Sequence, residues 1–303
     1  MKTQYPILKE SVIILIFLLQ GLTDRNYLYA QEIQEDTLVR IEMKDGNEFI
    51  GTIESESEIE VVLKTERLGL ITIKREDIRS MKEIPSGHIV GGEYWAPNPQ
   101  SGRHFWSPTG YGLNQGEGYY QNLWVLFNQV SYGISDNFTI GAGIVPIFLF
   151  GADFAPIWIT PKFSVPLKKE SVNLGGGAII ATVLGGNSDT FVGIAYGLTT
   201  FGNRDRNLSI GLGWGFVADD EFKKTPMINI SGIIRTGRRG YLVTENYFIS
   251  AEGENILILS LGGRTLWNRF SLDYGLFRPM HRDFRGFGLV GIPWLGFVIP
   301  FES

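Results

Sequence analysis

The sequence has no cysteine and only three histidines, His88, His104 and His281. Without cysteine there is no disulfide bond, no cysteine metal site, no thiol nucleophile and no lipid-modified cysteine to anchor the N-terminus. Basic residues are not in excess either, because 27 Lys and Arg stand against 32 Asp and Glu. A nucleic-acid partner favours a basic face. We therefore expect no nucleic-acid partner, and the sequence also suggests no cofactor and no metal.

Long apolar runs are scarce. The clearest, residues 11–22, spans about a dozen residues, whereas a membrane-crossing helix needs roughly twenty. Lysines precede this run, and the small residue Ala30 ends the polar stretch after it. This order predicts an export signal peptide over residues 1–30, so that the mature chain begins at Gln31.

Residues 37–84 contain five short alternating stretches, and Asp45-Gly46 between the first two is a strong hairpin signal. The DG-x-x-F-x-G pattern and the five-strand rhythm resemble the small SH3-like or Sm-like barrels. Sm-like barrels often bind RNA, but this segment is acidic and would repel phosphates. Its early strands carry Glu42, Glu48, Glu54, Glu56, Glu58 and Glu60. We therefore expect an interaction or spacer module whose partner is a periplasmic protein.

The pattern changes after this module. Residues 85–102 are rich in glycine and proline and predict a linker. Residues 103–303 predict about twelve strands, and no stretch has a helical periodicity long enough to cover a sheet. The expected strands lie near 103–111, 121–134, 138–150, 156–167, 172–184, 190–201, 208–218, 226–236, 241–251, 256–267, 270–279 and 287–301.

The stretch LSIGLGWGF, residues 208–216, puts large apolar side chains on one face and Ser or Gly on the other. Strands with nothing to cover such a face must close into a barrel in lipid or aggregate. We therefore expect an all-β protein: a twelve-stranded antiparallel transmembrane β-barrel preceded by a small SH3/Sm-like β-barrel. It would lie in the outer-membrane lipid of a Gram-negative bacterium, with the module in the periplasm.

Residues 103–143 contain an FxSPTxY…GEGYYQN…YGIxDNxxIG pattern. The segment resembles exported β-barrel proteins of Bacteroidetes-type bacteria, in which such a pattern opens the barrel. That family has no settled function. The resemblance therefore implies fold and location alone.

One hairpin predicts its own register. If Asn268-Arg269 is a two-residue turn, Trp267 faces Phe270, and Arg264 faces Asp273 on the other side of the sheet. The aromatic residues then meet lipid and the charged pair points inward. On this basis an arginine at Leu272 should damage folding far more than one at Ser271, which would only add charge to a polar lumen.

Four charged residues are expected to face the lumen: Lys162, Arg235, Arg264 and Asp273. They suggest a salt-bridged set of side chains that fills a narrow barrel or, alternatively, a mildly anion-preferring path. We favour the first, because the outer loops are short and no dedicated plug segment is visible. Glu245 either faces inward with its neighbours or marks a bulge that shifts the register.

No catalytic residue is recognisable, so we expect a protein that is not an enzyme. His104 and Ser107 are three apart on an expected strand and would face opposite sides, which prevents a base–nucleophile contact. An outer-loop cluster of His281, Arg282, Asp283 and Arg285 is a solvated loop or an acidic-ligand site. The sequence thus favours a structural or docking barrel, or a narrow passive pore. The alternative is a lipid-acting outer-membrane enzyme with an unrecognised site.

Overall fold

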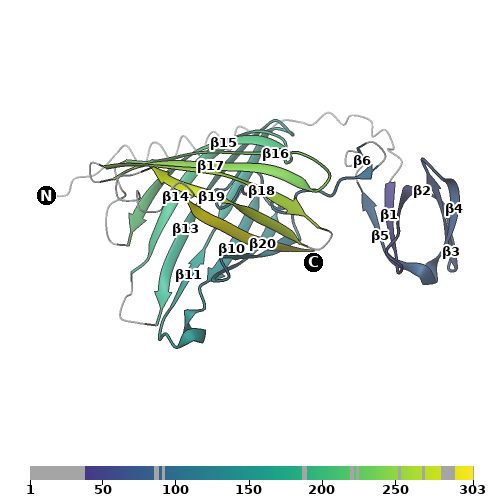
Figure 1. Cartoon of the computed structure of the whole chain (residues 1–303), viewed down its shortest axis with the longest axis horizontal. Coiled ribbons are helices and arrows are strands. Elements are labelled where there is room, and N and C mark those ends of the chain that lie inside the picture. The colour runs from purple at the N-terminus through teal and green to yellow at the C-terminus, as the bar shows by residue number, and fades with distance from the viewer. Residues whose placement is uncertain are drawn as a thin grey trace. The chain divides into compact units, whose positions relative to one another are not determined.

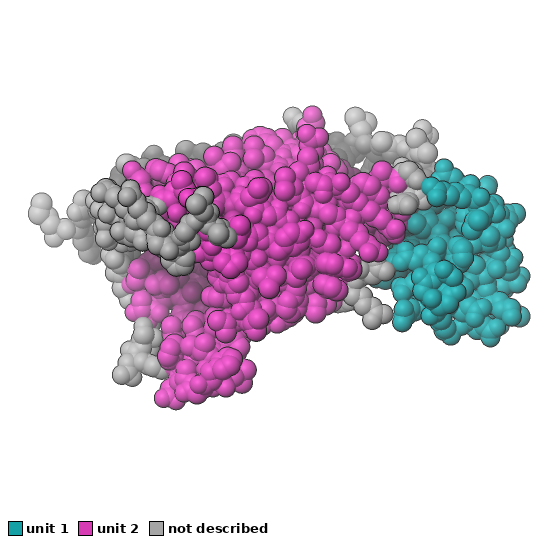
Figure 2. Space-filling model, viewed as in Figure 1, with its two compact units in different colours: residues 1–87 teal, residues 88–303 magenta. Residues whose placement is uncertain are grey.

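The computed structural model describes residues 38–84, 89–90, 93–185, 190–218, 222, 225–251, 254–267, 270–280 and 291–302. The chain divides into two compact units, residues 1–87 and 88–303 (Figure 2). The expected signal peptide and the expected cluster at residues 281–285 lie outside the described residues. Within the described part of the chain, no helix has the length and hydropathy to span a membrane.

The first unit is a five-stranded antiparallel sheet in the order β4-β3-β2-β1-β5 (Figure 1). Its strands are β1 (Leu38–Met43), β2 (Glu48–Glu56), β3 (Glu60–Thr65), β4 (Gly69–Lys74) and β5 (Ile78–Ile84), and the short 3-10 helix η1 (Arg75–Asp77) precedes β5. Gly46 takes a φ of 91° in the turn between β1 and β2, a conformation that glycine adopts without strain. Alternate residues of the sheet form a buried core of Val39, Ile41, Val61, Leu63 and Ile73.

The second unit is a closed twelve-stranded antiparallel barrel, as the sequence predicts (Figure 1). A two-stranded hairpin, β6 (Ile89–Val90) and β7 (Glu93–Tyr94), comes first. The barrel strands are β8 (Glu117–Leu123), β9 (Phe127–Ser135), β10 (Phe138–Ile144), β11 (Ala155–Ile159), β12 (Lys162–Lys168), β13 (Val172–Leu184), β14 (Val192–Gly202), β15 (Arg206–Val217), β16 (Met227–Arg235), β17 (Gly240–Ala251), β18 (Glu254–Leu266), β19 (Ser271–Met280) and β20 (Ile292–Glu302). Pairing of β20 with β8 closes the ring.

The strands β11 and β12 are two halves of one barrel strand, since both pair with β10 and with β13. Pro161 lies at the break and has no N–H to give to the ladder. The expected strand over 138–150 also ends early. Pro146 precedes a short 3-10 helix, η3 (Ile147–Phe150), in the connection between β10 and β11.

The predicted number of barrel strands is correct, although two of the predicted strands are wrong. Residues 103–111 form no strand, and the expected strand over 121–134 is in fact two, β8 and β9. The turn that separates β8 from β9 contains Trp124 at φ 50° and Val125 at φ 66°. Large side chains are rare in this left-handed region. The turn residues 124–126 include no Gly, Asn, Asp or Pro that would mark a turn in the sequence.

The outer face of the barrel is apolar. In β15, Leu208, Ile210 and Leu212 are 40–45% exposed, whereas Ser209 between them is fully buried. The same alternation runs through β16 and the turn-proximal part of β19. The expected faces of LSIGLGWGF are therefore confirmed for residues 208–213.

The predicted register of the hairpin formed by β18 and β19 is also confirmed. Arg264 pairs with Asp273, and Gly263 with Tyr274, in the ladder between β18 and β19. Trp267 stacks on Phe270, with ring centroids 4.7 Å apart. At one end of the barrel, short turns connect β9 to β10, β12 to β13, β14 to β15, β16 to β17 and β18 to β19. We call this end the turn end and the opposite end the loop end.

Candidate functional site

Residues 98–113 run through the inside of the barrel, and we call them the inner segment. They form a small hairpin, in which Arg103 bridges Pro108 and the His104 N–H donates to the Ser107 carbonyl at 2.9 Å. Most of the segment is buried, and Phe105 and His104 have no exposed surface. The expectation that no plug segment exists is therefore wrong, as is the expectation of a wall strand at 103–111.

The tip of the inner segment binds one carboxylate. The backbone N–H groups of Phe105, Trp106 and Ser107 all donate to Oε2 of Glu245, at 2.8–2.9 Å. The Tyr247 hydroxyl donates to the other oxygen of Glu245 at 2.6 Å. Glu245 is fully buried, so it faces inward, which decides between the two alternatives left open by its parity. Three consecutive N–H groups on one oxygen make a concave anion-binding backbone that orders the tip.

A second charged cluster holds the start of the inner segment. Arg264 Nε donates to Asp273 Oδ1 at 2.7 Å, and both side chains are almost completely buried. The Arg264 guanidinium also donates to the His104 carbonyl at 2.5 Å and to Asn98 Oδ1 at 3.1 Å. This inward pair confirms the predicted contact, but its further partners come from the inner segment.

The residues next to this pair are equally enclosed. Gln100 Nε2 donates to Ser271 Oγ at 2.9 Å and to Asp273 Oδ1 at 3.1 Å. Ser271 has no exposed surface. The expectation that Ser271→Arg only adds charge to an open polar lumen is therefore wrong, since no space remains there for an arginine.

Polar side chains from many other strands bind the inner segment. Lys162 of β12 donates to the Gly102 carbonyl at 2.7 Å and to the Tyr111 carbonyl at 2.5 Å. Thr200 of β14 accepts from the Gly110 N–H at 2.7 Å. Further bonds reach Thr139 of β10, Asn207 of β15 and Asn229 of β16. Side chains of β10, β12 and β14 to β16 therefore satisfy many of the buried polar groups of the segment, which would be costly to leave without partners.

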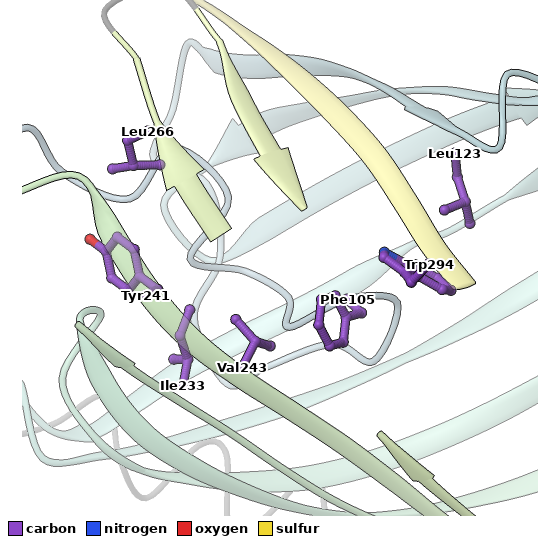
Figure 3. Close-up of a cluster of buried hydrophobic side chains, with 7 residues drawn as sticks. All are labelled: Phe105, Leu123, Ile233, Tyr241, Val243, Leu266 and Trp294. Atoms are coloured by element: carbon purple, nitrogen blue, oxygen red, sulfur yellow. The ribbon is translucent and has the colours of Figure 1, made fainter. Parts of the chain in front are cut away.

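An apolar contact completes the tip. Phe105 lies in a buried cluster with Leu123, Ile233, Tyr241, Val243, Leu266 and Trp294 (Figure 3). A Cβ on Gly262 would approach the Phe105 ring to 2.9 Å, and one on Gly275 to 3.2 Å. These paired glycines of β18 and β19 leave the space into which the ring packs.

The remaining predicted residues have separate places. Arg235 lies at the turn end, where it contacts Asp205 at 2.9 Å and stacks over the rings of Trp95 and Tyr241. His104 Nε2 contacts Asn207 Oδ1, and the Ser107 hydroxyl donates to Asn229 Oδ1. Their side chains thus have different partners. Among the described residues, no group of three metal-ligating side chains is present.

A cavity remains between the inner segment and the wall formed by β8 to β14. Its volume is about 70 Å³, and each water in a liquid takes roughly 30 Å³. Arg103, Trp106, Gln121, Lys162, Ile179 and Tyr196 are among the residues that line it. The space beside the inner segment therefore has room for water-sized groups.

Comparisons with known proteins give distant similarities in fold. No protein-family model matches the chain, and no curated protein matches it. The solved structures that it resembles include the KdgM porin, alone and in a complex described as containing disordered oligogalacturonate. These share 5% and 6% identity over 61% of this chain and 95% of theirs, with a TM-score of 0.41. The outer-membrane expressed OmpT of Vibrio cholerae shares 10% identity over 88% of this chain and 94% of its own, with a TM-score of 0.31.

Proposed function

We propose that this chain is an outer-membrane β-barrel that acts as a closed anchor and carries its N-terminal unit as a periplasmic docking module. The outward face supports the membrane location. Leucine, isoleucine and phenylalanine side chains there are 36–60% exposed along the strands from β9 to β20. Exposed apolar surface on this scale is typical of a surface that meets a membrane or a partner.

The observation that carries the closed state is the binding of the inner segment around the barrel wall. Its anchors are Glu245, the Arg264–Asp273 pair and Lys162, which lie on β17, β18, β19 and β12. A hydrated solute would have to displace these contacts together. Between the two alternatives from the sequence, this favours a filled lumen over an anion-preferring path.

Conductance across a planar lipid bilayer tests the closed state directly. We expect no discrete channel events from the complete mature chain, and stepwise conductance after Glu245→Ala, which leaves three buried N–H groups without an acceptor. Glu245→Gln is the matched control, because its amide oxygen still accepts from the tip, and it should stay silent. Discrete conductance from the unaltered protein would contradict the closed anchor.

The docking role follows from the composition of the first unit. Acidic residues outnumber basic ones over residues 38–84, and Ile59, Leu68 and Leu70 are at least 64% exposed. A photoreactive residue at each of these positions in living cells should give discrete protein adducts. The same residue at Asn47, an exposed turn position on the same unit, is the matched control. Adducts from neither set, or equally from both, would count against a specific protein partner.

A further inference from the structure

The cavity beside the inner segment is lined by two cations and by no carboxylate. The cations are Lys162 and Arg103, whose residues are 7% and 8% exposed. Arg103 lies 3.5 Å from Asp273, but that carboxylate already binds Arg264 with both oxygens. Lys162 donates only to two neutral carbonyls and has no ion-pair partner among the described residues. A buried ammonium without a counter-ion is costly.

Residues that line this cavity also carry polar atoms without partners. Gln121 Oε1 and Arg103 Nε have no hydrogen-bond partner, although both residues are more than nine-tenths buried. The Tyr196 hydroxyl lines the same space and makes no hydrogen bond to a described residue. Most buried polar atoms in native proteins have a partner. Around this one cavity, Lys162 thus lacks an anion, Arg103 and Tyr196 lack an acceptor, and Gln121 lacks a donor.

The lumen becomes apolar toward the loop end. On β13 to β15 the inward-facing positions near the turn end include the buried polar residues Asn173, Thr200 and Ser209. On β16 to β18 this end of the lumen carries the apolar residues that pack on Phe105. Further toward the loop end, β13, β14 and β16 to β18 have large apolar residues at inward positions, and these residues are half-buried. They are Ile179, Ile194, Met227, Ile249, Ile256 and Ile258.

Ile179 joins the two regions. It lines the cavity and pairs with Ile194, whose side chain lies on the same face of the sheet. A polar, cationic cavity is therefore continuous along the wall with an apolar inner face. A water-filled pore would favour a polar lining throughout, so this division points to an amphipathic occupant.

We propose that the lumen binds one single-chain carboxylate of the fatty-acid class, with its carboxylate beside Lys162 and its alkyl chain along the inward isoleucines. The cavity of about 70 Å³ has room for a carboxylate group. Its oxygens would accept from Lys162, Arg103 and Tyr196, and one water would donate to Gln121. This goes beyond the docking role and rests on the lumen alone, so either proposal can fail without the other.

A photoreactive decanoate with a diazirine at its far end tests this site. The complete mature chain is placed in phosphatidylcholine nanodiscs, irradiated with the probe, and its labelled residues are mapped by mass spectrometry. We expect saturable label on Ile194, Met227 or Ile249, which unlabelled decanoate displaces and decan-1-ol does not. Probe in the bilayer labels outward residues such as Ile210 without saturation. Label confined to outward residues, or equal displacement by decanol, overturns the proposal.

Variants identify the carboxylate site. Lys162→Met should lower inward labelling at least tenfold, and Lys162→Arg should restore most of it. Because Lys162 also binds the inner segment, Tyr196→Phe and Gln121→Leu provide wall variants without that role, and each should weaken labelling several-fold. Arg206→Met removes an exposed cation from β15 outside the lumen and should leave it unchanged. Equal losses in Arg206→Met and in the wall variants would refute a lumenal anion site.

Discussion

The strands of both units alternate apolar and polar side chains, but the apolar face is buried in the five-stranded unit and exposed in the barrel. In the five-stranded unit the interior is Val39, Ile41, Val61 and Leu63, and the exposed positions are rich in Glu and Lys. In the barrel the buried inward positions include Ser209, Ser231, Glu245, Arg264 and Asp273, while leucine and isoleucine lie exposed on the outside. An alternating pattern of apolar and polar residues therefore predicts a strand, but it does not predict which face of the strand is buried. The surroundings of the sheet, water or lipid, decide the face.

The largest effect should come from a charge buried on the inside of the barrel. Asp273→Ala leaves Arg264 fully buried without its carboxylate, and removing one partner of a buried pair costs about 3–5 kcal/mol. Urea unfolding of the barrel in lipid vesicles measures this change. The first unit should be unaffected, because none of its residues takes part. A loss below about 1 kcal/mol would mean that water reaches this pair.

An apolar deletion in the first unit should give the next effect. Ile41 is fully buried in the core with Val61 and Leu63, and replacing a buried Ile by Ala costs roughly 2–5 kcal/mol. We expect Ile41→Ala to lower the thermal midpoint of the first unit, followed by circular dichroism on residues 31–84 alone. Ile59→Ala, at a position 75% exposed, is the control. Similar midpoints for both variants would contradict the water-facing assignment of this unit.

These contrasts also explain which features of the fold could be predicted from the sequence. The faces of 208–213 and the Arg264–Asp273 register follow from periodicity and from one turn, which are local features. The inner segment could not be found in this way, because its position is set by long-range contacts such as Glu245 with the N–H groups of residues 105–107. The signal was present in another form. An inward-facing glutamate among Ser and Asn side chains needs several donors, and the wall side chains supply only the Tyr247 hydroxyl.

The same reasoning accounts for the strand errors. Residues 103–111 include alternating large side chains, but Gly102, Pro108 and Gly110 interrupt any wall strand at this place. The turn at Trp124 and Val125 uses residues that avoid positive φ. It is stabilised by tertiary packing instead, since Trp124 contacts Trp294 with ring centroids 5.3 Å apart. Neither feature is encoded in local propensity.

A charge placed on the outer face tests the lipid side of the comparison. Ile210 is 44% exposed near the middle of β15, where an arginine costs roughly 2–4 kcal/mol if the face lies in hydrocarbon. Ile210→Arg should therefore reduce folding into vesicles, while Ile210→Leu should not. In detergent micelles, where polar head groups lie near the arginine, the Ile210→Arg variant should lose less stability than in vesicles. Equal stability of Ile210→Arg and Ile210→Leu in vesicles would place this face in water.

The smallest effect should come from an ion pair of the first unit that matches the buried one in chemistry. Arg40 and Glu48 approach to 2.5 Å, but their side chains stay 20% and 23% exposed. Water screens such a pair, which contributes about 0.2–1 kcal/mol. Glu48→Ala should therefore change the stability of residues 31–84 by no more than this, and added salt should reduce the difference further. The double variant Arg40→Ala with Glu48→Ala isolates the pair energy from lost packing of the arginine stem. If Glu48→Ala costs as much as Asp273→Ala does in the barrel, burial does not separate the two pairs.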